Sequence, residues 1–391
     1  MSSPLAVALR ERWLGVLGGG QLGRMFVHAA QVHGYAVAVL EPDAASPAGA
    51  AGDRHLRASY LDAAALATLA VTCSAVTTEF ENVPAEALRT LALSLRVSPP
   101  AAAIEICQHR AREKRCFAAA GVACAPYALL TVDADLAGPA ICDLLPGILK
   151  TASLGYDGKG QAQVASAAEL PAAWAALGGV PCVLEKRLAL RFEISVIVAR
   201  GADGHVVHLP VQQNLHRDGM LAVTQVPAPD VDATLAAQAV ALAERLAQTL
   251  NYVGVLCVEF FILADGSLVA NEMAPRPHNS GHYSIDACDL SQFDLQVRTL
   301  AGLPLVAPRL HSAAVMLNLL GDLWWAAGAQ QAQEPAWALV LALPGVHLHL
   351  YGKTEPRRGR KMGHLTVTAA QQAAARAVAL QAAEQLGLPA F

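Results

Sequence analysis

The sequence predicts a mixed α/β and α+β protein of two or three domains, the first of which is built on a parallel sheet. Its 391 residues exceed what a single hydrophobic core usually serves. Up to about residue 108, short apolar runs alternate with amphipathic stretches, which is the pattern of parallel strands joined by helices. Later apolar runs are joined by short glycine-containing turns, which favour antiparallel hairpins.

The composition argues against several classes of function. The chain is 54% hydrophobic and 15% charged, as expected of a globular protein with a large interior. Its net charge is −4 with both signs dispersed, so neither nucleic acid nor a membrane is expected as a partner. The eight cysteines include no C-x-x-C pair, and no apolar run reaches the ~18 residues that span a bilayer. We expect a cytoplasmic protein without a zinc site or a disulfide framework.

A glycine-rich turn follows the first predicted strand. Gly18, Gly20 and Gly23 fit the G-x-G-x-x-G motif of dinucleotide-binding folds, and Glu41 ends the next strand, where such folds hold a ribose. The motif is weak alone, because backbone N–H groups at a helix N-terminus suit any anion. The other predictions for this domain are strands at 13–17, 35–41 and 75–79, and helices to about residue 33, at 62–70 and from residue 84.

Two acidic residues, Glu79 and Glu81, lie at the carboxyl end of the third predicted strand. Open α/β sheets place ligands at this end of their strands, so both residues are ligand candidates. The alternative is that they are acids that cap the helix beginning at Pro84. The sequence alone leaves both interpretations open.

A second glycine-rich segment begins at Gly155 and ends at Gln161, after a predicted strand at 147–150. Three glycines in six residues around Lys159 predict a flexible flap whose backbone can approach phosphates. It is not a Walker A sequence, because G-K-[ST] is missing, and a plain hairpin turn is the alternative. Lys150 would supply a fixed cation beneath the flap. We also expect a helix at 110–120 whose charges could form a solvated face, a linker at 133–146, a strand at 182–186 suited to an adenine pocket, and a polar loop at 212–219.

An Asp265-Gly266 turn joins two further strand-like runs, of which the second reaches Ala270. This dipeptide favours a tight hairpin, which would bring Glu259 close to Glu272. Two carboxylates beside Asn271 make an all-oxygen site of the kind that magnesium prefers. The alternative, a pair of solvent-exposed acids, is disfavoured by the stiff and polar segment that follows, at 275–282.

The C-terminal part is set off by Pro304 and Pro308 and contains predicted strands near 314–319 and 346–351. After them, six basic residues lie within the twelve positions from Lys353 to His364. They could form a solvated turn, but they suit a phosphate-bearing substrate, because arginine binds phosphate through two N–H groups.

These features together resemble the ATP-grasp superfamily. The motifs of this chain that resemble the N5-carboxyaminoimidazole ribonucleotide synthetase family are GGGQLGRM at 18–25, EFENVP at 79–84, GYDGKGQ at 155–161, NEMAPRPHNSGH at 271–282, and YGK followed by RKMGH. The resemblance covers residues from about 13 to 368. Sister enzymes such as glycinamide ribonucleotide transformylase share the flap and the glutamate pair, whereas HNSGH and RKMGH are specific. Arg358 departs from the proline that is common in the family.

The resemblance implies an N-terminal domain at 1–108, an ATP-grasp domain at 109–308 with a flap-bearing subdomain at about 124–188, and a C-terminal domain at 309–391. It implies an ATP-dependent ligase of purine biosynthesis whose substrates are ATP, bicarbonate and 5-aminoimidazole ribonucleotide, with a pair of Mg²⁺ ions as cofactors. The products would be N5-carboxyaminoimidazole ribonucleotide, ADP and phosphate, formed through carboxyphosphate. A homodimer is also implied.

The resemblance further implies roles for individual residues. ATP contacts would come from Arg110, Lys150, Gly155, Tyr156, Asp157, Gly158, Lys159, Gly160, Gln161, Glu185, Lys186, Glu193, His216, Asn271 and Glu272. Magnesium would be held by Glu259 and Glu272. The ribonucleotide would contact Gln21, Leu22, Glu79 or Glu81, Asn279, Lys353, Arg360 and Lys361. Catalytic roles would fall to Lys150, Tyr156, Asp157, Arg276 and His278, with bicarbonate near the last two.

Three rival functions remain at this stage. A nicotinamide-dependent dehydrogenase would rest on G-x-G-x-x-G alone. A catalytically silent ATP-binding regulator would have no need of both Glu259 and Glu272. The glycinamide ribonucleotide transformylase reaction is the closest rival among ligases, and its amide-bearing substrate should interact differently with Asn279.

Overall fold

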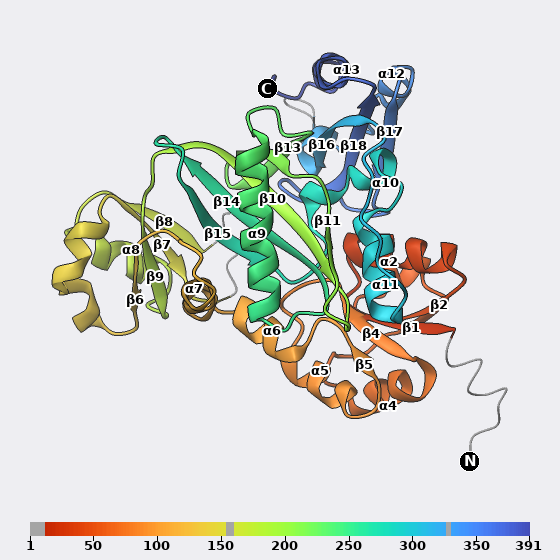
Figure 1. Ribbon diagram of the computed structural model, residues 1–391, viewed down its shortest axis with the longest axis horizontal. Coiled ribbons are helices and arrows are strands. Elements are labelled where there is room, and N and C mark those ends of the chain that lie inside the picture. Colours follow the sequence, from red (N-terminus) through yellow and green to blue (C-terminus); the bar gives the residue numbers. More distant parts are fainter. Residues whose placement is uncertain (1–11, 154–159, 326–329) are drawn as a thin grey trace.

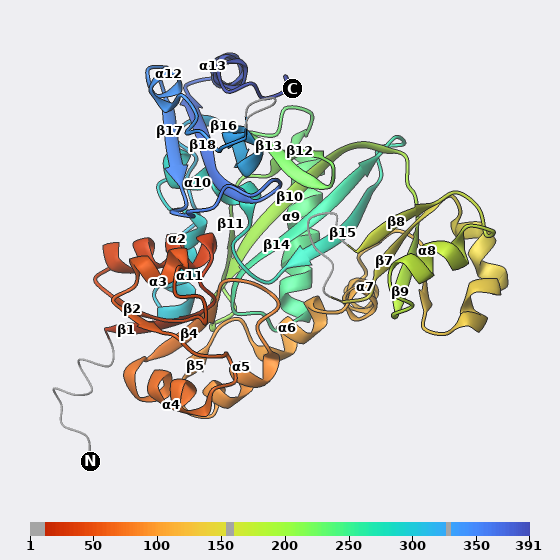
Figure 2. The ribbon, with the colours of Figure 1, turned by 180° about the vertical axis from the view of Figure 1, so that it is seen from behind.

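The computed structural model describes residues 12–153, 160–325 and 330–391, which form three sheets. In Figure 1 the N-terminal sheet lies at the bottom, a small sheet lies at one side, and the C-terminal strands lie at the top. A large sheet connects these parts, as the reverse view in Figure 2 also shows. The mixed α/β and α+β fold class predicted from the sequence is confirmed.

The N-terminal sheet is parallel, with the strand order β3-β2-β1-β4-β5. Strand order reverses between β1 and β4, which is where open α/β sheets bind ligands. Helices cover both faces: α2 packs on one face through Phe26, and α4 and α5 pack on the other through Leu69 and Leu88. The elements are β1 (Trp13–Leu17), α2 (Gln21–Val32), β2 (Ala36–Leu40), α3 (Pro47–Ala51), β3 (Arg54–Leu56), α4 (Ala63–Thr72), β4 (Ala75–Thr78), α5 (Ala85–Ala92), β5 (Arg96–Val97) and α6 (Ala101–Cys107).

The small sheet is antiparallel, with the order β6-β9-β7-β8. The linker predicted at 133–146 is wrong in part, because two short 3-10 helices occupy it. Ile141 and Leu144 are buried in the core of this sheet, which explains why the segment is ordered. The elements are α7 (Arg110–Ala119), β6 (Tyr127–Leu130), η1 (Asp133–Ala137), η2 (Pro139–Leu144), β7 (Gly147–Thr151), β8 (Gln161–Val164), α8 (Leu170–Ala176) and β9 (Cys182–Lys186).

The large sheet has the order β15-β14-β10-β12-β13-β16-β18-β17, and β11 pairs with β10. The polar loop predicted at 212–219 is wrong, because Gln212 to Arg217 form β12. Gln212 and Asn214 are buried, and both hydrogen-bond to the Ser195 hydroxyl, so polar side chains occupy interior positions of this strand. The strands are β10 (Leu190–Arg200), β11 (Val206–His208), β12 (Gln212–Arg217), β13 (Met220–Val226), β14 (Gly254–Leu263), β15 (Leu268–Ala274), β16 (Ala313–Leu320), β17 (Val346–Leu350) and β18 (Lys361–Ala369).

Helices connect and cover the large sheet. Helix α11 packs against α2 and β4 of the first sheet and against β10 and β14 of the large one, so it fixes the two sheets together. The large sheet runs across the boundary expected at residue 308, since β13 pairs with β16. The division into three domains therefore stays a prediction. The remaining elements are α9 (Ala233–Thr249), η3 (Asn279–Gly281), α10 (Ser284–Ala287), α11 (Gln292–Ala301), η4 (Gly321–Trp324), α12 (Trp337–Leu341) and α13 (Gln372–Gln385). None of the helices in the described ranges is long and apolar enough to cross a membrane.

Candidate active site

The hairpin of β14 and β15 places two glutamates side by side. Glu259 and Glu272 are direct cross-strand partners, as the Asp265-Gly266 turn predicted. Strand β15 continues to Ala274, so Asn271 and Glu272 belong to the strand and not to the loop after it. The Asn271 amide lies 3.5 Å from Glu259, and its Oδ1 atom is buried without a hydrogen-bond partner among the described residues. This unsatisfied oxygen beside two carboxylates fits a magnesium ion, which prefers oxygen ligands.

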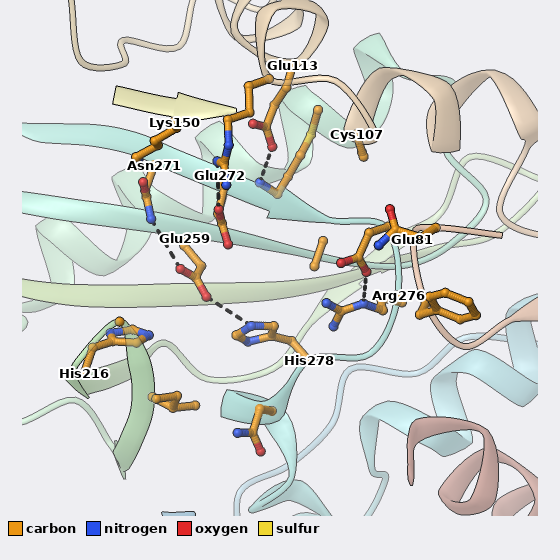
Figure 3. A pocket seen from close by; sticks show the side chains of 18 of the residues that line it. Glu81, Cys107, Glu113, Lys150, His216, Glu259, Asn271, Glu272, Arg276 and His278 are labelled. Atoms are coloured by element: carbon orange, nitrogen blue, oxygen red, sulfur yellow. Dashed lines mark hydrogen bonds and ion pairs between the residues drawn. The ribbon is translucent and has the colours of Figure 1, made fainter. Parts of the chain in front are cut away.

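Glu259 is held in its charged form by His278. The Nε2 atom of His278 lies 3.0 Å from Glu259 Oε1. A dashed line marks this contact in Figure 3. Burial disfavours the charged carboxylate, but the hydrogen bond with His278 outweighs it and lowers the pKa of Glu259. Glu259 is therefore an acceptor at neutral pH, suited to a cation.

Two basic side chains flank the glutamate hairpin from helix α7 and strand β7. Arg110 Nη1 lies 3.3 Å from Glu272 Oε2. Lys150 Nζ lies 2.9 Å from Glu185 Oε2, and Lys114, which was not among the predicted site residues, lies 3.1 Å from the other oxygen of Glu185. Burial acts against the charge of Glu185, but the two lysines lower its pKa.

A buried acid, Glu113, lies on the helix that carries Arg110. Its Oε1 atom accepts a hydrogen bond of 2.7 Å from the Met273 N–H. Burial, followed by the negative charge of Glu272, raises the pKa of Glu113 to about 8. The interpretation of this helix as a solvated charged face is wrong for Glu113 and Lys114, because both are buried.

A second acid–base pair faces the hairpin from strands β10 and β12. Glu193 Oε2 lies 2.9 Å from His216 Nδ1. Burial lowers the pKa of His216, but the hydrogen bond to Glu193 and the neighbouring carboxylates raise it above its ordinary value. Glu193, His216 and Glu259 each offer a ligand atom within 4.8 Å of the others.

Glu79 occupies the anion position of the glycine-rich turn. Its carboxylate accepts hydrogen bonds from the N–H groups of Gly20, at 2.6 Å, and Gly23, at 2.9 Å. These are the groups that a pyrophosphate would use in a dinucleotide-binding fold, so the turn already holds an internal anion. Burial raises the pKa of Glu79, and these two hydrogen bonds oppose the rise. The helix-capping alternative is wrong, because the acid in the first turn of α5 is Glu86, whereas Glu79 binds the glycine-rich turn and Glu81 pairs with Arg276.

Glu81 pairs with Arg276 across two parts of the fold. Its Oε2 atom lies 2.5 Å from Arg276 Nε. A dashed line marks this contact in Figure 3. Burial disfavours the charge of Glu81, but the guanidinium outweighs it and lowers the pKa of Glu81 to about 2. The pair joins the loop after β4 to the segment after β15.

One cavity of about 740 Å³ brings most of the predicted residues together. Its lining also includes Cys107, Glu113, Phe261 and His282. None of these four was predicted from the sequence as a site residue. The predicted residues that line it are Gln21, Leu22, Glu79, Glu81, Arg110, Lys150, Gln161, Glu193, His216, Glu259, Asn271, Glu272, Arg276, His278, Asn279 and Lys361.

Other predicted residues lie outside this lining. Gly160, Glu185, Lys186, Lys353 and Arg360 are not among the residues that line the cavity. Lys353 Nζ donates a hydrogen bond of 2.6 Å to the Lys361 carbonyl, so it still lies next to a lining residue. Five flap residues lie outside the described residues, namely Gly155, Tyr156, Asp157, Gly158 and Lys159.

The chain matches three domain families along its length. Residues 12–108 match the ribonucleotide synthetase preATP-grasp domain, residues 115–293 the ATP-grasp domain, and residues 314–378 the phosphoribosylaminoimidazole carboxylase C-terminal domain. The N5-carboxyaminoimidazole ribonucleotide synthase of Brucella melitensis is 44% identical over 355 residues, which are 90% of this chain and 95% of that protein. The Bacillus subtilis protein of the same name is 40% identical and covers 90% of each chain.

Solved structures agree over nearly the whole chain. An ADP complex of N5-carboxyaminoimidazole ribonucleotide synthetase is 38% identical, with a TM-score of 0.89 over 97% of this chain and 98% of that one. The Aspergillus clavatus N5-carboxyaminoimidazole synthase in complex with ADP and 5-aminoimidazole ribonucleotide is 33% identical, with a TM-score of 0.87 over 97% and 99%.

Proposed function

We propose that the reaction of the N5-carboxyaminoimidazole ribonucleotide synthase family takes place in the cavity of this chain. The chain belongs to that family. The chain is an ATP-grasp ligase of purine biosynthesis that joins a carboxyl group to 5-aminoimidazole ribonucleotide, using ATP. The observation that carries the proposal is that one cavity is lined both by the acidic hairpin and by residues expected to hold the ribonucleotide. A reaction that passes a reactive group from ATP to a second substrate needs both substrates in one enclosed space.

ATP is proposed to bind where β7, β10 and the hairpin face one another. Lys150 and Arg110 would contact the phosphates, and Glu193 would bind the ribose hydroxyls. Glu185 and Lys186 would lie at the adenine, although the carboxylate of Glu185 is engaged by Lys114 and Lys150. Glu259 and Glu272 would hold magnesium, whose chemistry when bound is to neutralise charge on the phosphate oxygens.

Bicarbonate is proposed to bind near Arg276 and His278. Both line the cavity, and both are held in place by carboxylates, Glu81 and Glu259 respectively. An oxygen of bicarbonate would attack the γ-phosphorus of ATP, and the bond between that phosphorus and the β,γ-bridging oxygen would break, releasing ADP. The exocyclic amine of the ribonucleotide would then attack the carboxyphosphate carbon or the CO₂ that it releases, and phosphate would leave. A cationic guanidinium beside the reacting oxyanions stabilises their charge.

The ribonucleotide is proposed to lie at the other end of the cavity. Gln21, Leu22, Glu79 and Asn279, the residues expected to contact it, all line the cavity. Its phosphate would meet the basic residues Lys353, Arg360 and Lys361, of which Lys353 is anchored on the carbonyl of Lys361. Tyr156 and Asp157, which lie outside the described residues, are proposed to contact the aminoimidazole because the family resemblance implies this role. We further propose a cytoplasmic homodimer, on the strength of the family alone.

The decisive experiment measures phosphate release from ATP and bicarbonate, with and without 5-aminoimidazole ribonucleotide. We expect strong stimulation by the ribonucleotide, together with its consumption in a one-to-one ratio to phosphate. Absence of stimulation would overturn the proposal. A parallel reaction with formate and glycinamide ribonucleotide tests the sister ligase activity, and turnover there in place of the first reaction would identify the chain as a transformylase.

A further inference from the structure

The buried amide of Gln292 has a fixed orientation. Gln292, the first residue of α11, is fully buried. Its Oε1 atom accepts a hydrogen bond of 2.8 Å from the His278 N–H, and its Nε2 atom donates one of 2.8 Å to the His278 carbonyl. Swapping the two ends of the amide would set an N–H against an N–H and an oxygen against an oxygen. The orientation of Gln292 is therefore determined by the backbone of His278.

This amide fixes the tautomer of His282. Gln292 Nε2 also lies 3.0 Å from His282 Nδ1, and because Nε2 carries the protons, His282 Nδ1 must be the acceptor. A neutral imidazole with an unprotonated Nδ1 carries its proton on Nε2. His282 lines the cavity, so Nε2–H is the ring group left for a ligand. Burial, and next the nearby His278, lower the pKa of His282, which keeps the ring neutral.

Gly281 is required for this arrangement. A Cβ atom at this position would lie 2.5 Å from Gln292 Oε1, which is closer than real Cβ contacts allow. The glycine of the HNSGH motif thus lets Gln292 approach the backbone between the two histidines. His282 is 1% exposed and packs against the rings of Phe293 and His364, so its ring cannot easily turn away.

Asn279 lies one turn before His282 and has an unsatisfied side chain. It is 7% exposed, and neither its Oδ1 nor its Nδ2 atom has a hydrogen-bond partner among the described residues. It lines the same cavity, and its carbonyl accepts a hydrogen bond of 3.1 Å from the His282 N–H. A buried amide without partners costs free energy, so this side chain is prepared for a polar ligand.

We propose that Asn279 and His282 form the subsite for the ribose of the ribonucleotide, with Gln292 as the residue that positions His282. The Asn279 amide and the His282 Nε2–H group bind the sugar hydroxyls, which both donate and accept hydrogen bonds. The subsite rests on the proposed function, since it presumes that a ribonucleotide enters this cavity.

A sugar fits this subsite better than a phosphate does. An amide and a neutral imidazole carry no net charge, whereas phosphate sites in proteins favour cations such as arginine. Lys361, Arg276 and His278 line the cavity as well, and all three are charged neighbours of His282, so His282 lies near both the group proposed for the phosphate and the groups proposed for the reaction. The ribose links the phosphate to the base, so it must cross the region between these two ends.

The first test compares His282→Asn with His282→Gln. The amide nitrogen of glutamine reaches about as far as Nε2 of histidine, whereas asparagine is too short to replace this donor. We expect His282→Asn to raise the KM for the ribonucleotide about tenfold and to change the KM for ATP less than twofold, and His282→Gln to restore most of the loss. Equal effects of both variants on the two KM values would overturn the assignment.

The second test removes a ribose hydroxyl from the ribonucleotide, the group that His282 is proposed to bind. With wild-type enzyme, the 2′-deoxy or the 3′-deoxy ribonucleotide should bind about tenfold more weakly, and this penalty should disappear in His282→Asn. If both deoxy penalties persist unchanged in the variant, His282 does not bind the sugar. If only the ribose subsite is wrong, the ribonucleotide will still stimulate phosphate release by the wild-type enzyme. If the proposed function is wrong, that stimulation will be absent.

The third test observes the tautomer directly. In protein labelled with ¹⁵N-histidine, the signal missing from His282→Gln identifies His282, and its Nδ1 should show the shift of an unprotonated nitrogen at pH 7. Gln292→Glu should transfer the proton to Nδ1, because a carboxylate can only accept. A protonated Nδ1 in the wild-type protein would contradict the role of Gln292.

Discussion

The ion pair of Glu81 and Arg276 allows a stability prediction that is independent of catalysis. We consider Glu81→Gln, which keeps the size of the side chain and removes its charge. The pKa of Glu81 is lowered from 4.5 to about 2. At about 1.4 kcal/mol per pKa unit, this corresponds to about 3 kcal/mol of stabilisation at pH 7. The Glu81 side chain is 24% exposed, so screening by solvent reduces the expected loss to about 2 kcal/mol.

The pH dependence of this loss has a definite sign. The folded-state pKa lies below the ordinary value of 4.5, so the contribution is fully present above that value. It is lost as the pH falls from 4.5 toward 2. The difference in unfolding free energy between wild type and Glu81→Gln should therefore be constant from pH 7 to about 5.5 and should shrink in more acidic solution.

The assay is urea unfolding followed by far-UV circular dichroism and by tryptophan fluorescence, whose agreement tests for a single transition. The matched control is Glu105→Gln, because Glu105 also pairs with an arginine, Arg89, but on the surface, with side-chain exposures of 35% and 53%. Exposed pairs contribute about 0–1 kcal/mol. A loss of unfolding free energy for Glu81→Gln at pH 7 no larger than that for Glu105→Gln, or one that grows in acid, would show that the Glu81–Arg276 pair does not stabilise the fold in this way.

Three further predictions concern the site and the turn that supports it. Glu272→Ala should abolish ATP turnover with an unchanged circular dichroism spectrum, and retained ATPase activity would remove Glu272 from the metal site. Lys353→Ala should raise the KM for the ribonucleotide far more than that for ATP, whereas Arg358→Ala, whose side chain is 72% exposed, should change neither. Gly18→Ala should destabilise the protein by about 2 kcal/mol or more, measured by thermal unfolding, because Gly18 has a φ of +109° and a Cβ would overlap the side chain of Glu79.

Local patterns sufficed for the parts of the fold that local interactions determine. The βαβ alternation predicted the parallel N-terminal sheet, and the Asp265-Gly266 dipeptide predicted the hairpin on which Glu259 faces Glu272. Both signals lie within a few residues of the structure that they specify. The periodicity of apolar residues then indicates which face of each helix or strand is buried.

The same local patterns did not predict strand β12, because its buried positions carry polar residues. Strand β12 carries Gln212, Asn214 and His216, a composition typical of a loop. It forms a strand because Ser195 and Thr224, from the neighbouring strands, satisfy its side chains. Such partners are distant in the sequence, so no local pattern reveals them.

Local patterns also could not predict which charged residues would pair with one another. Arg276 and Glu81 are 195 residues apart, and the Gly23 N–H and Glu79 are 56 residues apart. The sequence identified each of these residues as a candidate, but it could not tell that Glu79 would occupy the glycine-rich turn. His282 belonged to a recognised motif, yet its role as a donor depends on Gln292, which no motif contained.

The buried lysine Lys114 gives Glu185 a second ion-pair partner in the proposed ATP site. Lys150 is paired with Glu185, so in the proposed ATP site a phosphate that drew Lys150 away would take this partner from a buried carboxylate. Lys114 contacts the other oxygen of Glu185, at 3.1 Å, and it belongs to a different element, α7. Glu185 would therefore keep one cation if Lys150 turned to a phosphate, and the free-energy cost of that movement would fall. Since Lys114 is 1% exposed and does not line the cavity, we expect any contribution of Lys114 to ATP binding to act through Glu185 and not through contact with the nucleotide.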